Sequence, residues 1–372
     1  MITSKRRLAL AVASSALPLT LVGCGALGGS GSSASAGPSK GDDVRVGLLL
    51  PETENKRYEK FDYPIIKEKV SELTHKQGVV EYANARSSKT RQAAQMRKMI
   101  DEKVDVILLD AVDAHAIAGE VQKAKDAGIP VIAYDRLAEG PIDAYISFDN
   151  ELVGEVQGRT LLEALDSSGG GRPRIVMMNG SPTDPNASQF KKAALSQLDG
   201  KVTVARSYDT KDWKPENARA NMAKAIQQLG VSGIDGVYSA NDGMAGGVIK
   251  AFKDLGVTQL PPITGQDADL EAVQRIVTGE QYMSVYKPYP TEAENAAQMA
   301  IAKVQGRDIE FDSLARDTVD SPTQKNIPAQ LVSVVALTKK NIKSTVVADG
   351  IYKISEICTA AYQPACAAAG LL

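Results

Sequence analysis

Histidine, cysteine and tryptophan are scarce in this 372-residue sequence, and neither sign of charge dominates it. The two histidines, His75 and His115, do not stand in a spacing such as His-Glu-x-x-His, which argues against a metal motif of that kind. The formal net charge is −2 and no basic cluster follows the first residues, which argues against a nucleic-acid surface. Apolar runs of membrane length are also missing after the N-terminal region.

The N-terminus has the organisation of a secretory signal. Residues 5–7 are basic, residues 8–20 are largely apolar, and residues 21–24 are Leu-Val-Gly-Cys. The apolar stretch is shorter than the roughly 20 residues that span a bilayer, so we expect its removal rather than a permanent membrane helix. Leu-Val-Gly-Cys resembles the lipobox of bacterial lipoproteins, which implies cleavage before Cys24 and attachment of lipid to its sulfur. A plain secreted protein with an incidental cysteine is the alternative.

Two further features concern the ends of the mature chain. Residues 25–40 are almost entirely Gly, Ser, Ala and Pro, which predicts a flexible tether with a reach of about 20 to 25 Å. The remaining cysteines, Cys358 and Cys366, flank a short loop that contains Pro364. In an oxidising compartment this spacing favours a disulfide that pins the C-terminal tail, with metal binding by two thiols as the weaker alternative.

Apolar runs alternate with amphipathic segments along the body of the chain, which predicts alternating strands and helices. In the first half, strands are predicted at 45–50, 79–83, 104–109 and from 131, and helices at 57–77, 90–103 and 114–127. After residue 148 the pattern repeats, with helices at 153–165, 187–198, 216–229, 246–255 and 270–277 and strands at 174–178, 202–205, 235–239 and 262–264. Repeated alternation requires parallel pairing with right-handed crossovers, so we predict two doubly wound α/β domains.

Polar side chains follow the predicted strands abruptly. The apolar run VIAY ends on the opposite charges of Asp135 and Arg136, and similar polar strings stand at 180–182, 239–242, 265–269 and 285–287. Ligands of doubly wound sheets lie outside the carboxyl ends of the strands, so these side chains are expected where water or a ligand meets them. Carboxylates that accept, together with Arg, Lys and Asn that donate, suit a neutral ligand rich in hydroxyls, such as a sugar.

Each of these positions also has a simpler interpretation. Asp and Asn at strand ends are frequent helix caps, and an adjacent Asp-Arg pair often forms an exposed ion pair that contributes little to stability. Trp213, the single tryptophan, stands in the polar segment 212–216. It is either a core anchor or a platform for the apolar face of a sugar ring.

Several strings together resemble one known family. They are AYDR at 133–136, YISFDN at 145–150, GSP at 180–182, W-x-PEN at 213–217, ND followed by AGG from 241, and GQDAD at 265–269. From about residue 44 to 335 the chain resembles the D-xylose-binding proteins of bacterial ABC transporters, a group within the sugar-binding type I periplasmic binding proteins. The resemblance implies two lobes, a three-stranded hinge, and a sugar pocket in the cleft between the lobes.

The resemblance also implies roles for nine residues. In the first lobe, Asp135 would accept from sugar hydroxyls, Arg136 would donate to hydroxyl or ring oxygens, and Arg57 with Tyr58 would stand near the start of the first helix. In the second lobe, Trp213 would cover one sugar face, and the polar ring would be completed by Asn186, Asn241, Asp267 and Lys287. Residues 51–54 (PETE) differ from the first loop of the family. No catalytic residue, metal or cofactor is expected.

The expected organisation follows from the signal features and the resemblance. Residues 1–23 are assigned to the signal, 24–42 to the lipidated cysteine and tether, and 346–372 to a disulfide-bonded tail. The N-terminal lobe is expected at 43–148 plus 288–326 and the C-terminal lobe at 149–287 plus 327–345. Crossings between the lobes are expected near 148–149, near 287–288 and around 326–331.

We therefore expect a monomeric, lipid-anchored receptor on the extracytoplasmic face of the cell membrane, which binds D-xylose or a related aldose and delivers it to an ABC permease. A sensor that presents the sugar to a membrane kinase is the alternative. A carbohydrate-processing enzyme is disfavoured, because neighbouring cations should keep Asp135 and Asp267 ionised and so remove the general acid. A repressor would need an N-terminal helix-turn-helix, whose place the signal takes.

Overall fold

The computed structural model describes residues 40–166 and 171–372. The predicted signal, the lipobox cysteine Cys24 and most of the predicted tether lie outside these residues. In the described part of the chain, no helix combines the length and the hydropathy that a membrane span requires.

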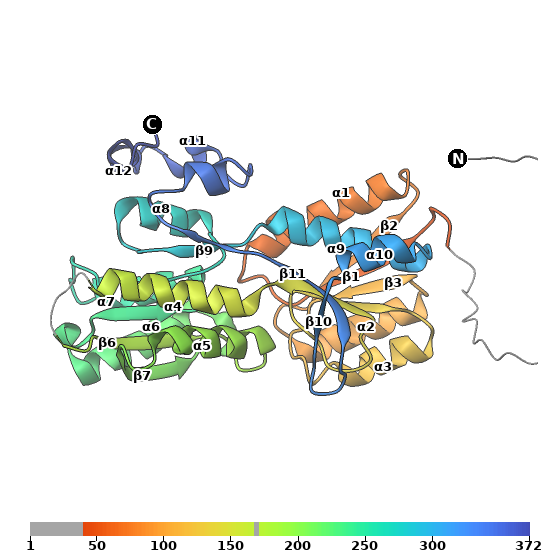
Figure 1. The fold of residues 1–372 in the computed structure, drawn as a ribbon, viewed down its shortest axis with the longest axis horizontal. Helices are drawn as coiled ribbons and strands as arrows, with labels where there is room; N and C mark the ends of the chain where they lie inside the picture. Colours follow the sequence, from red (N-terminus) through yellow and green to blue (C-terminus); the bar gives the residue numbers. More distant parts are fainter. Residues whose placement is uncertain (1–39, 167–170) are drawn as a thin grey trace, which may run out of the picture. The chain divides into compact units, whose positions relative to one another are not determined.

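The first lobe is built on a seven-stranded sheet with the strand order β10-β11-β5-β4-β3-β1-β2 (Figure 1). All neighbouring strands are parallel except β10 and β11. The central strands are buried on both faces, as their near-continuous apolar sequences predict. The strands are β1 (Arg45–Leu50), β2 (Val79–Asn84), β3 (Val106–Leu109), β4 (Val131–Tyr134), β5 (Ala144–Phe148), β10 (Asp317–Val319) and β11 (Ile327–Val332).

Helices cover both faces of this sheet. Alternate residues of β1 point to opposite sides, so Leu48 and Leu50 pack with α1 and α9, whereas Leu49 packs with α2 and α3. The helices are η1 (Tyr58–Asp62), α1 (Tyr63–Leu73), α2 (Lys89–Asp101), α3 (Ala118–Asp126), α9 (Tyr289–Val304) and α10 (Asp308–Leu314). This arrangement confirms the predicted doubly wound lobe.

The second lobe contains a three-stranded parallel sheet, β7-β6-β8, and an antiparallel pair, β9-β12. The strands are β6 (Arg174–Asn179), β7 (Thr203–Asp209), β8 (Gly236–Ser239), β9 (Ser284–Tyr286) and β12 (Val335–Leu337). The strand expected at 262–264 is a single parallel bridge between Val237 and Ile263. The segment nevertheless connects the two sheets, because the neighbouring Gly265 accepts a backbone hydrogen bond from Val285 of β9.

Two pairs of helices enclose the three-stranded sheet (Figure 1). Side chains of α4 and α5 pack in one core cluster, and side chains of α6 and α7 pack in another. The helices of this lobe are α4 (Asn150–Asp166), α5 (Pro185–Leu198), η2 (Lys211–Trp213), α6 (Pro215–Leu229), η3 (Val231–Gly233), α7 (Asp242–Lys253) and α8 (Leu270–Thr278).

The chain passes between the lobes between β5 and α4, between β9 and α9, and between β11 and β12. The first two passages lie near the expected positions. The third was expected around 326–331, which is one strand too early, because β11 pairs with β5 in the first sheet. Ile327 and Ala329 are buried in the core of the first lobe and hold β11 there.

A cystine segment, defined here as residues 338–372, follows β12. It contains η4 (Lys343–Val347), α11 (Ile354–Ile357) and α12 (Gln363–Ala368). Cys358 and Cys366 are joined in a disulfide, which is the pairing that their spacing favours. The segment packs against α8 in a cluster of its own.

Candidate functional site

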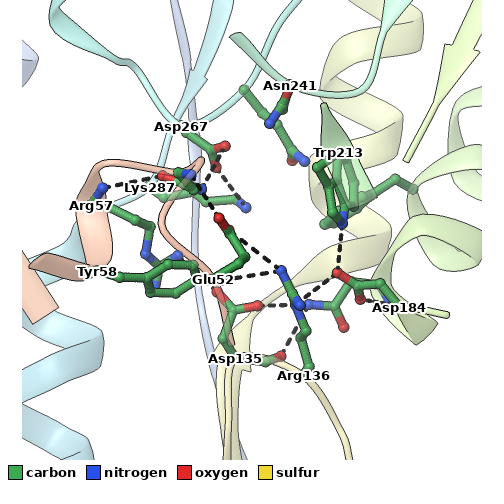
Figure 2. A pocket seen from close by; sticks show the side chains of 14 residues that line it. Glu52, Arg57, Tyr58, Asp135, Arg136, Asp184, Trp213, Asn241, Asp267 and Lys287 are labelled. Atoms are coloured by element: carbon green, nitrogen blue, oxygen red, sulfur yellow. Dashed lines mark hydrogen bonds and ion pairs between the residues drawn. The ribbon is translucent and has the colours of Figure 1, made fainter. Parts of the chain in front are cut away.

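A pocket between the lobes is lined by residues that lie near the strand ends of both lobes (Figure 2). The nine residues singled out in the sequence all line it, which shows that the polar strand ends meet at one hollow. The first lobe supplies Glu52, Asn55, Arg57, Tyr58, Asp135 and Arg136. The second supplies Asp184, Asn186, Phe190, Trp213, Asn241, Gln266, Asp267 and Lys287.

Arg57 is buried among three carboxylates. Its guanidinium lies 2.9 Å from Asp62, 2.8 Å from Asp135 and 2.5 Å from Glu292. It also lies over the ring of Tyr289, 4.7 Å from the ring centroid. Asp135 lines the pocket, whereas Asp62 and Glu292 stand behind it. These two acids therefore fix the guanidinium from the side that a ligand does not reach.

The three acids around Arg57 differ in their ionisation. Burial opposes ionisation of Asp135, but the charges of Arg57 and Lys287 outweigh this effect and lower its pKa. Burial raises the pKa of Asp62 and of Glu292, since the charge of Arg57 only partly offsets the lost hydration. The acid that faces the pocket is therefore an ionised acceptor at neutral pH.

Two of the pocket acids have a left-handed backbone. The φ angle is 57° at Asp135 and 95° at Asp267. For residues other than glycine this conformation costs on the order of 1–3 kcal/mol and persists where the surroundings fix it. The Asp135 carbonyl accepts from the hydroxyls of Tyr145 and Ser147, both at 2.8 Å, and its N–H donates to Ile146. These bonds hold the backbone from which the Asp135 carboxylate projects.

The second arginine, Arg136, is also buried among three carboxylates. Its Nε lies 2.8 Å from Asp184 and 3.4 Å from Asp110, and its Nη2 lies 3.8 Å from Glu52. Burial raises the pKa of Asp110 well above its usual value and that of Glu52 to about 7, in both cases against the charge of Arg136. The pocket therefore contains a partly protonated carboxyl group at neutral pH.

Trp213 and Phe190 form an aromatic wall of the second lobe. The indole Nε1 donates to Asp184 at 3.1 Å, and the ring stands edge-on to Phe190. A Cβ on Gly180 would lie 2.0 Å from the indole, so glycine is required for this close approach. The indole belongs to the hydrophobic core and also lines the pocket, so its position is compatible with both interpretations made from the sequence.

The remaining polar wall combines a cation, an acid and an amide. Lys287 Nζ lies 3.1 Å from Asp267 Oδ1, and Asn55 of the first lobe donates to Asp267 Oδ2 at 3.2 Å. The side chain of Asn241 accepts from the Met244 N–H and so caps α7, while it also lines the pocket. Asn241 is therefore a helix cap, as its simpler interpretation predicts, and it also lines the pocket.

Three pairs of pocket residues join the lobes across the cleft. They are Arg136 with Asp184 at 2.8 Å, Asn186 with Asp135 at 2.8 Å, and Asn55 with Asp267 at 3.2 Å. Each pair places a donor of one lobe against an acceptor of the other. A ligand with several hydroxyls can replace such bonds with its own, since every hydroxyl both donates and accepts.

The structure rules out one of the simpler interpretations made from the sequence. Asp135 and Arg136 are each 6 % exposed, so they are not an exposed ion pair that contributes little to stability. Loss of Arg136 would leave several buried acids without their cation, which costs stability. The lowered pKa of Asp135 agrees with the expectation that this acid stays ionised. Glu52, which was not considered from the sequence, has a pKa of about 7.

Five lining residues were not identified from the sequence. Asp184 precedes Pro185 and has the pattern of a helix cap, and its side chain does accept from the Asn186 N–H at the start of α5. Glu52 belongs to the segment 51–54 that differs from the family, which was a usable signal. Gln266 belongs to the quoted string GQDAD but was not singled out within it, and Asn55 and Phe190 carried no signal of their own.

Among residues 40–166 and 171–372, no group of three or more His, Cys, Asp or Glu side chains is arranged to hold a metal ion. The pocket donors and acceptors are instead paired with one another, as the ion pairs of Arg57, Arg136 and Lys287 show (Figure 2).

Known proteins resemble this chain over most of its length. The D-xylose-binding periplasmic protein of Escherichia coli (strain K12) is 34% identical over 321 residues, which cover 85% of this chain and 93% of that protein. The D-xylose-binding periplasmic protein of Haemophilus influenzae is 34% identical over 316 residues, covering 83% of this chain and 91% of that protein.

Solved structures show the same fold. An ABC transporter solute-binding protein from Clostridium phytofermentans, with bound β-D-glucose, has a TM-score of 0.77 at 26% identity and covers 84% of this chain and 99% of its own. A carbohydrate transporter solute-binding protein from Chloroflexus aurantiacus, in complex with D-glucose, has a TM-score of 0.70 at 25% identity. The match covers 84% of this chain and 97% of that protein. Residues 46–308 match the family model of the periplasmic binding protein domain. The chain thus belongs to the periplasmic binding protein family and has its type I fold.

Proposed function

We propose that this protein is the extracytoplasmic sugar receptor of an ABC importer, and that it binds D-xylose or a related aldose in the pocket between its lobes. The observation that carries this proposal is the buried ring of donors and acceptors that both lobes contribute to one hollow. Asp135 and Asp267 are the acceptors, and Arg136, Asn186, Asn241 and Lys287 are the donors. Such a mixture matches a neutral polyol better than an ion of either sign.

The strength of these contacts is sufficient for transport without chemistry on the sugar. Micromolar affinity corresponds to about −8 kcal/mol. Hydrogen bonds to charged groups contribute roughly 1.5 to 3 kcal/mol each, so several of them outweigh the cost of ordering the ligand and closing the lobes. The aromatic surface of Tyr58 and Trp213 adds apolar contact for the ring carbons.

The relatives support this class of ligand. Besides the D-xylose-binding proteins, a multiple sugar-binding periplasmic receptor of Rhizobium radiobacter is 31% identical over 289 residues, covering 72% of this chain and 80% of that protein. Because this relative is named for multiple sugars, we extend the proposal to aldoses related to D-xylose.

Calorimetric titration against a panel of pentoses and hexoses tests the proposal. We expect one-to-one binding, with D-xylose or a close relative tightest. If no aldose of the panel produces heat of binding at concentrations up to the millimolar range, the proposed function is wrong.

A turnover assay separates a receptor from an enzyme. The partly protonated Glu52 and the ionised Asp135 are the kinds of group that a glycosidase uses, so an assay is required. We expect aryl glycosides and free aldoses to remain unchanged after prolonged incubation with the protein. Release of the aryl group in proportion to protein concentration would reverse the assignment.

We further propose that the mature protein is a monomer anchored to the membrane by lipid on Cys24, with the following residues as a tether. The Leu-Val-Gly-Cys string supports this proposal. The Cys24→Ala variant should move from the membrane fraction to the medium or the soluble fraction, whereas the parent should label with radioactive palmitate. Membrane retention of Cys24→Ala would argue against the anchor.

A sensor is the second candidate, because one of the relatives is named a receptor. The same closed form could dock on a permease or on a membrane kinase. Sugar uptake by cells that lack this protein distinguishes the two roles. Loss of uptake supports transport, whereas normal uptake with a lost transcriptional response to the sugar supports sensing.

A further inference from the structure

The cystine segment packs against the second lobe. Its apolar side chains pack with Val273, Ile276 and Val277 of α8. Gln274 of the same helix donates to the backbone carbonyl of Glu356 at 3.1 Å. These contacts make the segment part of the second lobe, so it should move with that lobe when the cleft opens.

One side chain of the segment also reaches the first lobe. Tyr352 is 4 % exposed. Lys60 Nζ lies 4.5 Å from the centroid of its ring, and the ring of Phe61 stands edge-on to it at 6.2 Å. Lys60 and Phe61 belong to η1 of the first lobe. The tyrosine therefore joins the two lobes outside the sugar pocket.

The same edge of the cleft carries a second link, and both links adjoin the pocket. Lys56, just before η1, forms an ion pair with Glu271 of α8, the helix against which the cystine segment packs. Between the two links stand Arg57 and Tyr58, which line the pocket. A movement of η1 away from the segment would therefore carry two pocket residues with it.

We propose that the cystine segment is a latch that stabilises the closed arrangement of the two lobes through Tyr352. This inference rests on the proposed function, because it assumes that the lobes separate to admit the sugar. Contacts that exist in the closed form and are broken in the open form favour closure, and they raise the affinity of a ligand that binds the closed form. The disulfide supports the latch by holding together the fold that presents Tyr352.

Two variants and a matched control test the latch. Tyr352→Ala removes the ring, and Lys60→Gln removes the cation above it while keeping a similar chain length. Lys67→Gln is the control, because Lys67 also lies over a tyrosine ring, Tyr63, but within one lobe. Small-angle X-ray scattering of the full chain without sugar reports on opening, and calorimetry with D-xylose reports on affinity.

We expect Tyr352→Ala and Lys60→Gln to increase the radius of gyration without sugar, and the parent and Lys67→Gln to agree with each other. D-xylose should bind Tyr352→Ala about five- to seventyfold more weakly, the range that one ring pair and one cation–π contact together supply. The double variant should match Tyr352→Ala alone, since Tyr352→Ala already removes the contact between Lys60 and Tyr352.

The latch and the sugar site can fail separately. If the parent binds no sugar of the panel, the proposed function fails, while the scattering without sugar still tests the latch. If Tyr352→Ala and Lys60→Gln match the parent both in radius of gyration and in sugar affinity, the cystine segment is no latch. Additive effects in the double variant would likewise contradict a shared contact between Lys60 and Tyr352.

Discussion

Single residues in this pocket act as members of two charged clusters, one around Arg57 and one around Arg136. In each cluster, some of the acids line the pocket, and the others lie on the far side of the guanidinium. The acids behind, such as Glu292 and Asp110, stay protonated more readily than free acids, because burial raises the pKa of each. Each arginine is therefore held by several acids, while the buried cluster does not carry an excess of negative charge.

Asp135→Asn tests the role of the pocket acid. The change keeps the shape but removes the charge that accepts from a sugar hydroxyl, so the dissociation constant for the preferred aldose should rise at least about tenfold. The free energy of unfolding should fall only modestly, because Arg57 keeps Asp62 and Glu292 as partners. Calorimetry and urea denaturation measure the two effects. Asp209→Asn, at an exposed strand end outside this pocket, is the control, and equal affinity of all three proteins would remove Asp135 from the site.

Glu52→Gln tests the buried acid near Arg136. The pKa of Glu52 is about 7 in the folded protein against a usual 4.5. A raised pKa contributes stability that is complete below about pH 4.5 and lost as the pH rises through about 7. Relative to Glu52→Gln, the parent should therefore lose on the order of 3 kcal/mol of unfolding free energy between about pH 4.5 and pH 8. Urea denaturation across this range measures the loss, and a constant difference between the two proteins would contradict it.

Pocket residues could be identified from the sequence where they directly follow an apolar strand. Asp135 and Arg136 were found because two charges interrupt a buried run, and Asp267 because it belongs to a polar string at another strand end. Asp184 was missed because its pattern, an acid before proline, is typical of a helix cap, and it serves that role as well. The two carboxylate oxygens of one residue can perform two tasks, and a linear pattern does not separate them.

Elements of secondary structure were predictable where the apolar pattern is local. The four strands and three helices predicted for the first half follow from runs such as 45–50 and 131–134 together with glycine and proline stops. The segments that were misjudged depend on distant partners. β11 belongs to the first sheet through its pairing with β5, and Ile263 forms one bridge to Val237. Pairing across such distances leaves no trace in the periodicity of one segment.

The cystine segment provides the prediction at the scale of elements. The disulfide joins cysteines with a sequence separation of 8. In the chain-entropy model, it lowers the entropy of the unfolded chain and so raises the free energy of unfolding by about 2–3 kcal/mol. In the double variant Cys358→Ser and Cys366→Ser, backbone amides of α11 and α12 should exchange with deuterium faster, while strands of the first sheet keep their protection. Cys24→Ser, which keeps the disulfide, is the control. Equal exchange of the segment in all variants would show that the disulfide adds no stability there.

The whole molecule consists of two lobes whose strand ends supply one pocket, together with a segment that links them at one edge. The alternation of strands and helices predicted the two lobes, and the resemblance to periplasmic binding proteins predicted that they share a cleft. The direct bonds across the cleft, such as Arg136 with Asp184 and Asn186 with Asp135, could not be predicted, because they depend on how closely the lobes approach. These bonds occupy the positions that we assign to the sugar.

A structure of the protein determined with saturating D-xylose, or with the tightest aldose of the panel, tests the central claim most directly. Our account predicts one sugar molecule between the lobes, in contact with Asp135 and Arg136 on one side and with Asn241 and Asp267 on the other. An empty pocket at saturating sugar, or a sugar bound to one lobe away from these residues, would contradict it.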